Sequence, residues 1–228
     1  PAPFLNGRRL SRRAAKSRDA PSLSGAAMSS PAPTRLITIE EYLAGEAVSP
    51  IRHEYVGGEI FAMTGARRVH NLIVGNAFVQ LRQSLRGTPC GVYVADLKLQ
   101  IDTADAFVYP DLMVSCDPRD AGPEADLCIR HPWFVLEVLS DSTAAYDRGK
   151  KFEFYRQIES LTHYLLVEQT RPHAELFCRN AQGLWVLHPL GPGDSIRIQE
   201  PHAFDWPVAA LFEGVPFDPP AGASVRQA

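Results

Sequence analysis

The chain has 228 residues, which is enough for one domain with a buried core, alone or with tails. Hydrophobic residues make up 45% and charged residues 21%, and no apolar run approaches the roughly 18 to 20 residues that cross a bilayer, so the composition predicts a soluble protein with no membrane association. The net charge is −3, but residues 1–27 carry 6 − 1 = +5, which leaves −3 − 5 = −8 for the remainder. This acidic body excludes a protein that coats nucleic acid electrostatically, although not a nuclease whose metal site adds negative charge.

Residues 1–33 are predicted to form a disordered basic tail, because Pro, Ser, Ala, Gly and Arg dominate and no apolar periodicity occurs. Met28 fits a natural start preceded by extra residues, whereas the basic composition fits a targeting segment or a nucleic-acid-binding arm, and both interpretations remain open. The tail lacks the apolar stretch of a secretory signal. Residues 34–213 are expected to form the folded domain and residues 214–228 a flexible C-terminal tail.

Two helices and a hairpin are predicted in the first part of the domain. Thr38 and Glu41 fit a capping box, which begins a short helix that ends at about residues 43–45. Gly57-Gly58 lies between two short apolar segments and is typical of a hairpin turn. Apolar residues recur at positions 69, 73, 77, 81 and 85, and this spacing predicts a helix over residues 68–86.

Four strands follow, over residues 92–101, 107–114, 133–140 and 163–167. A helix over residues 144–159 separates the last two. Residues 174–178 and 184–188 are predicted to pair as a hairpin, and a short helical turn is expected at residues 208–212. This order predicts a single α/β domain with a central mixed β-sheet flanked by helices.

The four cysteines, at positions 90, 116, 128 and 178, include no CxxC pair. Zinc-ligand spacing is therefore absent, and a disulfide framework is not expected in a chain of this length. The sequence predicts four free thiols in a reducing cytoplasm.

Two carboxylates lie inside apolar strand segments. Asp111 follows Pro110, which cannot donate to a strand ladder and therefore predicts an edge or a bulge that re-aims the side chain. Glu137 has apolar neighbours on both faces of its strand. Buried carboxylates are costly unless a positive group meets them, and a divalent cation such as Mg²⁺ is the expected partner. A salt bridge or an exposed strand face is the alternative for each.

Lys151 is predicted to face the core, because it shares a helix face with Phe154, Tyr155 and Ile158. A core-facing lysine needs an acidic partner, and the buried carboxylates supply one. An ordinary surface pair with Asp147, four residues earlier, is the alternative.

These residues together resemble a known family. The pattern comprises Pro110-Asp111, then Glu137-Val138-Leu139-Ser140 with Thr143, and then Asp147-Arg148 with Lys151 and Tyr155. It is similar to the Uma-two family of restriction-endonuclease-like proteins in the PD-(D/E)XK nuclease superfamily. The resemblance runs from about residue 36 to residue 212. The superfamily's Glu-x-Lys would place a lysine at position 139, where this chain has Leu139. The resemblance to this family implies that the lysine comes from the following helix instead, which matches Lys151.

The resemblance implies a restriction-endonuclease-like core and a metal-dependent endonuclease that hydrolyses DNA. It implies that Asp111, Glu137 and the backbone carbonyl of Val138 bind Mg²⁺ or Mn²⁺, and that Lys151 orients or helps to deprotonate the attacking water. No organic cofactor is implied, and a homodimer and a cytoplasmic location are expected.

Three further residues are possible members of the site. Glu54 could add a carboxylate or be a surface acid of the hairpin. Asp96 precedes Lys98 in an acid-x-Lys pair, which fits either a site residue or a polar residue on a half-exposed strand. His70 could contact substrate or have a structural role. Two other functions remain open: a non-catalytic, nucleic-acid-associated or regulatory member of the same fold, and a nuclease that acts on RNA.

Overall fold

The structure is a computed structural model that describes residues 35–63, 65–122 and 126–217. The expected basic tail at residues 1–33 lies outside the described residues, as does most of the expected C-terminal tail. Residues 214–217 are described, and Val215 packs into the core. None of the described helices is long and apolar enough to cross a membrane.

The N-terminal elements form where the local sequence predicts them. Helix α1 (Ile39–Val48) begins with a capping box in which Thr38 and Glu41 bond to each other's backbone N–H groups. Strands β1 (His53–Val56) and β2 (Glu59–Ala62) pair around Gly57 and Gly58, which have φ angles of 56° and 92°. Positive φ at both central residues is what a two-residue hairpin turn requires. The hairpin is confirmed, whereas α1 extends a few residues beyond its predicted end.

A six-stranded sheet forms the centre of the domain, with the strand order β11-β10-β9-β8-β6-β3. Strands β8 and β9 run parallel, and the other neighbours are antiparallel, so the predicted mixed sheet is confirmed. The strands are β3 (Gly91–Val94), β6 (Leu112–Ser115), β8 (Phe134–Leu139), β9 (His163–Glu168), β10 (Ala174–Arg179) and β11 (Trp185–Leu190).

Two smaller sheets complete the domain. A five-stranded sheet has the order β2-β1-β5-β4-β7, and a two-stranded sheet pairs β12 with β13. Their remaining strands are β4 (Lys98–Ile101), β5 (Ala106–Val108), β7 (Cys128–Ile129), β12 (Ser195–Ile198) and β13 (Phe204–Pro207). Short 3₁₀ turns occur at η1 (Asp102–Ala104), η2 (Pro118–Asp120) and η5 (Val208–Phe212), and η5 is the helical turn that the sequence predicts.

Two predicted strands are each divided between two sheets. The segment 92–101 becomes β3 and β4, separated by residues 95–97, where Ala95 and Asp96 have φ angles of 26° and 53°. The segment 107–114 becomes β5 and β6, separated at Pro110 and Asp111. The prediction of single strands was wrong, because apolar alternation continues through a bend and does not reveal that each half pairs in a different sheet.

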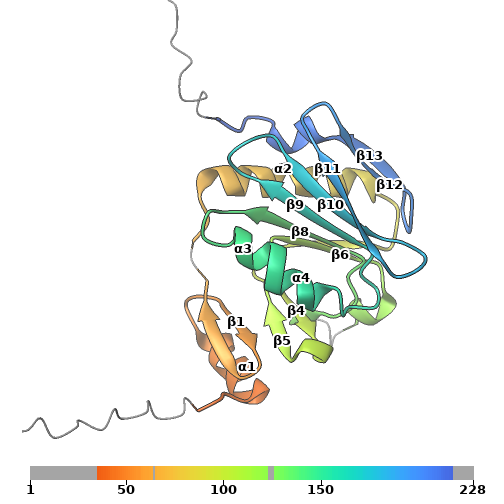
Figure 1. Cartoon of the computed structure of the whole chain (residues 1–228). Coiled ribbons are helices and arrows are strands. Elements are labelled where there is room, and N and C mark those ends of the chain that lie inside the picture. The colour runs from red at the N-terminus through yellow and green to blue at the C-terminus, as the bar shows by residue number, and fades with distance from the viewer. Residues whose placement is uncertain (1–34, 64, 123–125, 218–228) are drawn as a thin grey trace, which may run out of the picture. The chain divides into compact units, whose positions relative to one another are not determined.

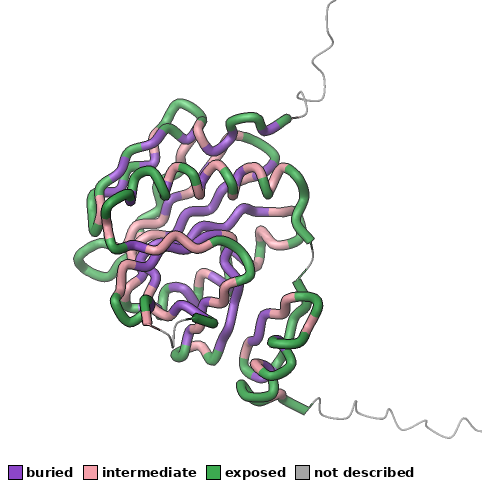
Figure 2. The backbone as a smooth tube through the Cα atoms, turned by 180° about the vertical axis from the view of Figure 1, so that it is seen from behind, coloured by how far each residue is buried: buried purple, intermediate pink, exposed green. Residues whose placement is uncertain are grey.

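One face of the six-stranded sheet packs against helix α2 (Arg68–Ser84), which confirms the predicted long helix. Its apolar stripe of Ile73, Ala77 and Leu81 meets Leu136 of β8 and Leu165 of β9 in a core that also includes β12, β13 and η5. Figure 1 shows α2 and the α3–α4 segment on opposite sides of this sheet. Figure 2 shows the buried strands between the more exposed helices and loops.

The other face packs against a short, irregular helical segment and the five-stranded sheet. The segment comprises α3 (Ala144–Tyr146), the π-helical η4 (Asp147–Lys151) and α4 (Phe152–Tyr155). The predicted regular helix over residues 144–159 was therefore too long and lacked the π-helical turn. Such turns are rare, and helical periodicity alone does not reveal them.

The prediction of four free thiols was wrong for two of the cysteines. Cys90 directly precedes β3, Cys116 directly follows β6, and the pairing of Gly91 with Ser115 sets the two cysteines opposite each other. They form a disulfide, whereas Cys128 and Cys178 are free. Because the two positions are 26 residues apart, only the pairing of the strands reveals that they are neighbours.

The buried carboxylate of Glu46 links helix α1 to strand β1 and to Tyr109. Glu46 is 3% exposed and accepts hydrogen bonds from the backbone N–H of His53 (2.9 Å) and the hydroxyl of Tyr109 (2.8 Å). Its second oxygen lies 3.0 Å from the His53 ring. This network fixes the start of β1 against the residue that precedes Pro110, and so it positions the segment that carries Asp111.

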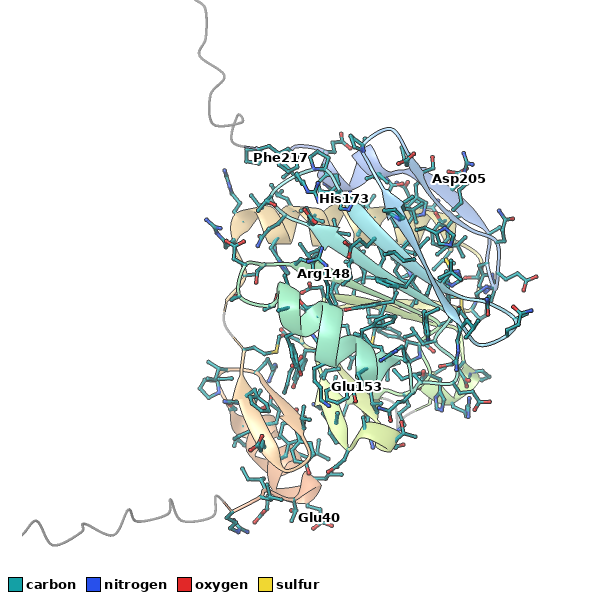
Figure 3. The ribbon with its side chains drawn as sticks, viewed as in Figure 1. Glu40, Arg148, Glu153, His173, Asp205 and Phe217 are labelled. Atoms are coloured by element: carbon teal, nitrogen blue, oxygen red, sulfur yellow. A yellow bond between two sulfur atoms is a disulfide. The ribbon has the colours of Figure 1, made fainter. Side chains whose placement is uncertain are left out.

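We expect Glu46→Ala to lower the free energy of unfolding by roughly 2 to 4 kcal/mol, because two buried donors would lose their acceptor. Urea unfolding measures the change. Glu40, which is labelled in Figure 3 and exposed on the same helix, provides the matched control. Glu40→Ala is expected to cost less than about 1 kcal/mol. An equal loss in both variants would show that the Glu46 network does not stabilise the fold.

Candidate active site

Asp111 and Glu137 lie opposite each other on neighbouring strands. The pairing of Leu112 with Leu136 continues in register to these two residues. The backbone N–H of Asp111 donates to Glu137 Oε2 (3.2 Å), and the Val138 N–H donates to Asp111 Oδ2 (2.7 Å). The bend at Pro110 ends β5 and lets the Asp111 carboxylate turn toward β8. Strand pairing therefore brings together two carboxylates that are 26 residues apart in the chain.

Lys151 enters the same place from the helical segment. Its side chain is 7% exposed, and its Nζ lies 2.9 Å from Glu137 Oε1, 3.2 Å from Glu54 Oε1 and 3.8 Å from Asp147 Oδ1. Residues four apart lie on the same side of a helix, and the irregular segment turns the side that carries Asp147 and Lys151 inward. The neighbouring residues of the motif face outward: Arg148 pairs with Glu168 and Glu175, and Figure 3 labels Arg148 on this segment.

Glu54 reaches the cluster from β1. Its carboxylate is largely buried and accepts a hydrogen bond from the backbone N–H of Tyr109 (3.2 Å) while it pairs with Lys151. The five-stranded sheet thus contributes one acid to a cluster whose other members come from the central sheet and the helical segment.

His70 lies at the start of α2, with Nε2 2.9 Å from Asp111 Oδ1. Burial lowers the pKa of the His70 ring, but hydrogen bonds to the Asp111 carboxylate and the Val138 backbone outweigh it and raise the pKa above its usual value. His70 therefore contacts two of the groups that the sequence indicates as metal ligands, and it holds the orientation of Asp111.

Acidic groups outnumber basic groups in this cluster. Burial raises the pKa of Glu137 to about 8, and the nearby carboxylates of Asp111 and Asp147 act in the same direction. Burial also raises the pKa of Asp147. Burial would lower the pKa of Lys151, but the charges of Glu137, Glu54 and Asp147 raise it well above its usual value. One lysine therefore does not neutralise the carboxylates, and burial favours the protonated form of Glu137.

Not all of the site residues predicted from the sequence lie together in the structure. Glu54, His70, Asp111, Glu137 and Lys151 come together, whereas the side chain of Asp96 is 75% exposed and pairs with Arg52 at 3.5 Å. Within the described part of the chain, Asp96 makes no hydrogen bond or ion pair with the five residues that come together.

Two residues of the cluster were not expected in the site. Asp147 is 4% exposed and faces Lys151, and the buried Tyr155 donates a hydrogen bond to Glu137 Oε1 (2.6 Å). The spacing of Asp147 and Lys151 was visible in the sequence, but in an α-helix it equally fits a surface pair. The packing role expected for Tyr155 is seen as well, since its ring packs against Tyr164.

The donor set fits a hard divalent cation. Carboxylate oxygens of Glu54, Asp111 and Glu137 converge, the backbone of Val138 lies beside them, and the acidic groups outnumber the basic ones. Oxygen donors of this kind suit Mg²⁺ or Mn²⁺ rather than a thiophilic metal. Asp111 and Glu137 would hold the ion, with the Val138 carbonyl and Glu54 in reach of the same cluster.

The fold and the cluster define a mixed α/β protein with the fold of a restriction-endonuclease-like enzyme. The crystal structure of a “putative nuclease” belonging to DUF820 from Anabaena variabilis superposes with a TM-score of 0.62 over 78% of this chain and 99% of that chain. The two sequences are 15% identical, so this similarity concerns the fold alone.

The chain belongs to the Uma2 family, described as “Putative restriction endonuclease”, which matches residues 39–209. Two uncharacterized proteins of Synechocystis sp. are similar over most of their length. One is 35% identical over 186 residues, which cover 82% of this chain and 96% of the relative. The other is 31% identical over 168 residues, which cover 74% of this chain and 94% of the relative. The family that the sequence motifs resemble is thereby confirmed.

Proposed function

We propose that this protein is a metal-dependent endonuclease that hydrolyses phosphodiester bonds in DNA. The observation that carries the proposal is the buried cluster in which Asp111, Glu137, Glu54 and Lys151 meet from four separate segments of the chain. A structural role alone does not explain a buried group with more acids than bases, since such a group destabilises the fold unless a cation neutralises it. Membership in a family described as restriction endonucleases supports the same reaction class.

Each residue has a role in this proposal. Asp111 and Glu137 hold Mg²⁺ or Mn²⁺ with the Val138 carbonyl. A bound divalent ion supplies Lewis-acid stabilisation of the phosphoryl oxygens and lowers the pKa of water. Lys151 orients the attacking water and offsets negative charge in the transition state. His70 positions Asp111 by a hydrogen bond, and Tyr155 positions Glu137 in the same way.

A cytoplasmic location and a homodimer belong to this proposal. Two copies would place two sites on the two strands of a duplex. The edge strand β2 supports association, because it exposes Ile60 (44%) and Phe61 (49%). Light scattering of the purified chain tests the dimer.

The test is cleavage of supercoiled plasmid by the full chain with Mg²⁺ or Mn²⁺. We expect nicking that stops with a chelator, and we expect Asp111→Asn to slow it by at least about two orders of magnitude, because that change removes a metal-binding charge. Asp96→Asn is the matched control, since it alters an exposed aspartate that pairs with Arg52.

Each outcome separates the proposal from its alternatives. Full activity in Asp111→Asn would show that cleavage arises elsewhere. A chain that cleaves only RNA would keep the site but change the substrate. A chain that binds Mn²⁺ at this site but cleaves neither nucleic acid would be a non-catalytic member of the fold.

A further inference from the structure

Two cysteines and a histidine gather on the α2 side of the central sheet. Cys90 precedes β3, Cys116 follows β6, and His202 lies in the connection between β12 and β13. The two Sγ atoms and a ring nitrogen of His202 all lie within 4.8 Å of one another. Three segments that are far apart in the sequence thus present two sulfurs and an imidazole to one point.

The two sulfurs have two possible chemical states. They are bonded as a disulfide in this structure, and strand pairing keeps the two residues adjacent whether or not that bond exists. Thiol reductants keep most cysteines reduced in the cytoplasm, the location proposed above. In that environment the position would hold two neighbouring thiols beside an imidazole.

We propose that reduced Cys90 and Cys116 form a Zn²⁺ site with His202, and that the disulfide is the oxidised, metal-free state of the same site. This inference goes beyond the proposed nuclease activity. Thiolate and imidazole are the ligands that zinc prefers in proteins. Tetrahedral Zn–S bonds of about 2.3 Å place two sulfurs about 3.8 Å apart, a separation that side chains on neighbouring strands can span. A water molecule would complete the coordination.

The surroundings of the sulfurs favour a metal-bound thiolate. The indole Nε1–H of Trp133 donates to Cys116 Sγ (3.2 Å), and such a hydrogen bond stabilises a thiolate ligand. Cys90 lines a hollow of about 350 Å³, whose lining also includes Arg82 and Arg86. His202 makes no hydrogen bond or ion pair with any residue in the described ranges, so its ring is available as a ligand.

A second group of potential ligands comprises Glu168, His173 and Glu175, and its carboxylates already have ionic partners. Arg148 pairs with both of its carboxylates, and Arg171 pairs with Glu168. Its negative charge is already neutralised by arginine, whereas in the described ranges Cys90, Cys116 and His202 form no ion pair.

Atoms and electrons balance in the conversion between the disulfide form and the zinc-bound form. A dithiol reductant gives two electrons and two protons to the Cys90–Cys116 bond and becomes a disulfide itself. Zn²⁺ then displaces the two thiol protons and bonds to both sulfurs and to the neutral imidazole of His202. In the reverse direction a disulfide oxidant accepts two electrons from the sulfurs and two protons from water and becomes a dithiol, while the Cys90–Cys116 bond re-forms and Zn²⁺ is released.

The test uses the full chain, reduced with a dithiol and then freed of reductant without oxygen. Co²⁺ is the spectroscopic probe, because thiolate ligation gives an intense sulfur-to-metal charge-transfer band that carboxylate sites do not give. We expect one equivalent to bind with this band and with tetrahedral visible bands, and Zn²⁺ to displace it. We expect His202→Ala to weaken binding roughly tenfold or more. Cys128→Ser/Cys178→Ser is the matched control, since it removes only the two free cysteines.

The oxidised wild-type chain is a second control that requires no substitution, and it should show no charge-transfer band. Three results would overturn the proposal: no band in the reduced wild-type chain, undiminished affinity in His202→Ala, or a band that survives in Cys90→Ser/Cys116→Ser. A fourth result, loss of the band in the Cys128→Ser/Cys178→Ser variant, would show that the metal-binding thiolates belong to those two cysteines and not to Cys90 and Cys116.

Discussion

Lys151→Met is expected to reduce plasmid cleavage by at least about 100-fold, because it removes the positive charge that the mechanism needs at the transition state. Methionine preserves much of the apolar stem, so packing changes little. The ammonium group lies 2.9 Å from Glu137 and 3.2 Å from Glu54 and is almost fully buried. Its removal leaves these carboxylates without their buried partner.

The same change is expected to destabilise the metal-free protein by roughly 3 to 5 kcal/mol when the carboxylates are ionised. The loss should be smaller as the pH falls below about 8, because Glu137 then takes up a proton. Lys150→Met is the matched control. The Lys150 side chain is 52% exposed and pairs with Glu153 on the surface, so both cleavage and stability should stay close to wild type.

Plasmid cleavage and urea unfolding measure the two effects. If Lys151→Met cleaves as fast as Lys150→Met, the lysine of the site is misassigned. If Lys151→Met loses cleavage but keeps its stability at alkaline pH, the buried ion pairs contribute little to the fold and the role of Lys151 is catalytic alone.

Metal-free wild-type protein is expected to lose stability as the pH rises toward about 8. Burial raises the pKa of Glu137 to about 8 in the folded state, above its ordinary value of 4.5. Between these two values the folded chain binds more protons than the unfolded chain, so the free energy of unfolding falls with increasing pH. The contribution is complete below about pH 4.5 and is lost as the pH passes about 8, with a slope of at most about 1.4 kcal/mol per pH unit.

Glu137→Gln is expected to flatten this dependence and to abolish cleavage. The amide stays neutral at every pH and lacks the charge that binds a divalent ion. Mg²⁺ or Mn²⁺ should restore the stability of the wild-type chain at alkaline pH, since a bound cation replaces the proton of Glu137, but it should not stabilise Glu137→Gln as strongly.

Urea unfolding at several pH values, with a chelator and with added metal, measures this effect. Glu153→Gln is the control, because the Glu153 side chain (labelled in Figure 3) is 53% exposed and follows Lys151 in the same helical segment. A pH dependence that persists unchanged in Glu137→Gln would assign the titrating group to another residue, and Asp147 would be the next to test.

Many of the local elements could be predicted from the sequence. The capping box at Thr38, the turn at Gly57-Gly58, helix α2 and strands β8 to β11 all occur where periodicity and turn chemistry indicate them. These features depend on interactions among residues a few positions apart, so a short window of sequence contains the information. The divided strands and the π-helical turn were missed, because their cause lies in distant parts of the chain.

The acidic and basic residues of the cluster were also recognisable one at a time. A glutamate inside an apolar strand and a lysine on a core-facing stripe are conspicuous because burial of either charge is unfavourable without a partner. The sequence did not distinguish Asp147, which is buried, from a surface acid, or Asp96, which is exposed, from a buried one. Whether each of these aspartates is buried depends on which side of its turn faces the core of the domain.

The sequence by itself determined the mixed α/β class, the family and the local elements, because composition, periodicity and turn residues act over short distances. Only the tertiary structure decided that Asp111 and Glu137 face each other, that Lys151 of the helical segment reaches Glu54 on the five-stranded sheet, and that Cys90 and Cys116 are neighbours. These contacts join residues 26 to 97 positions apart. They depend on the order in which strands pair, and that order is set by the packing of the whole domain rather than by any local pattern.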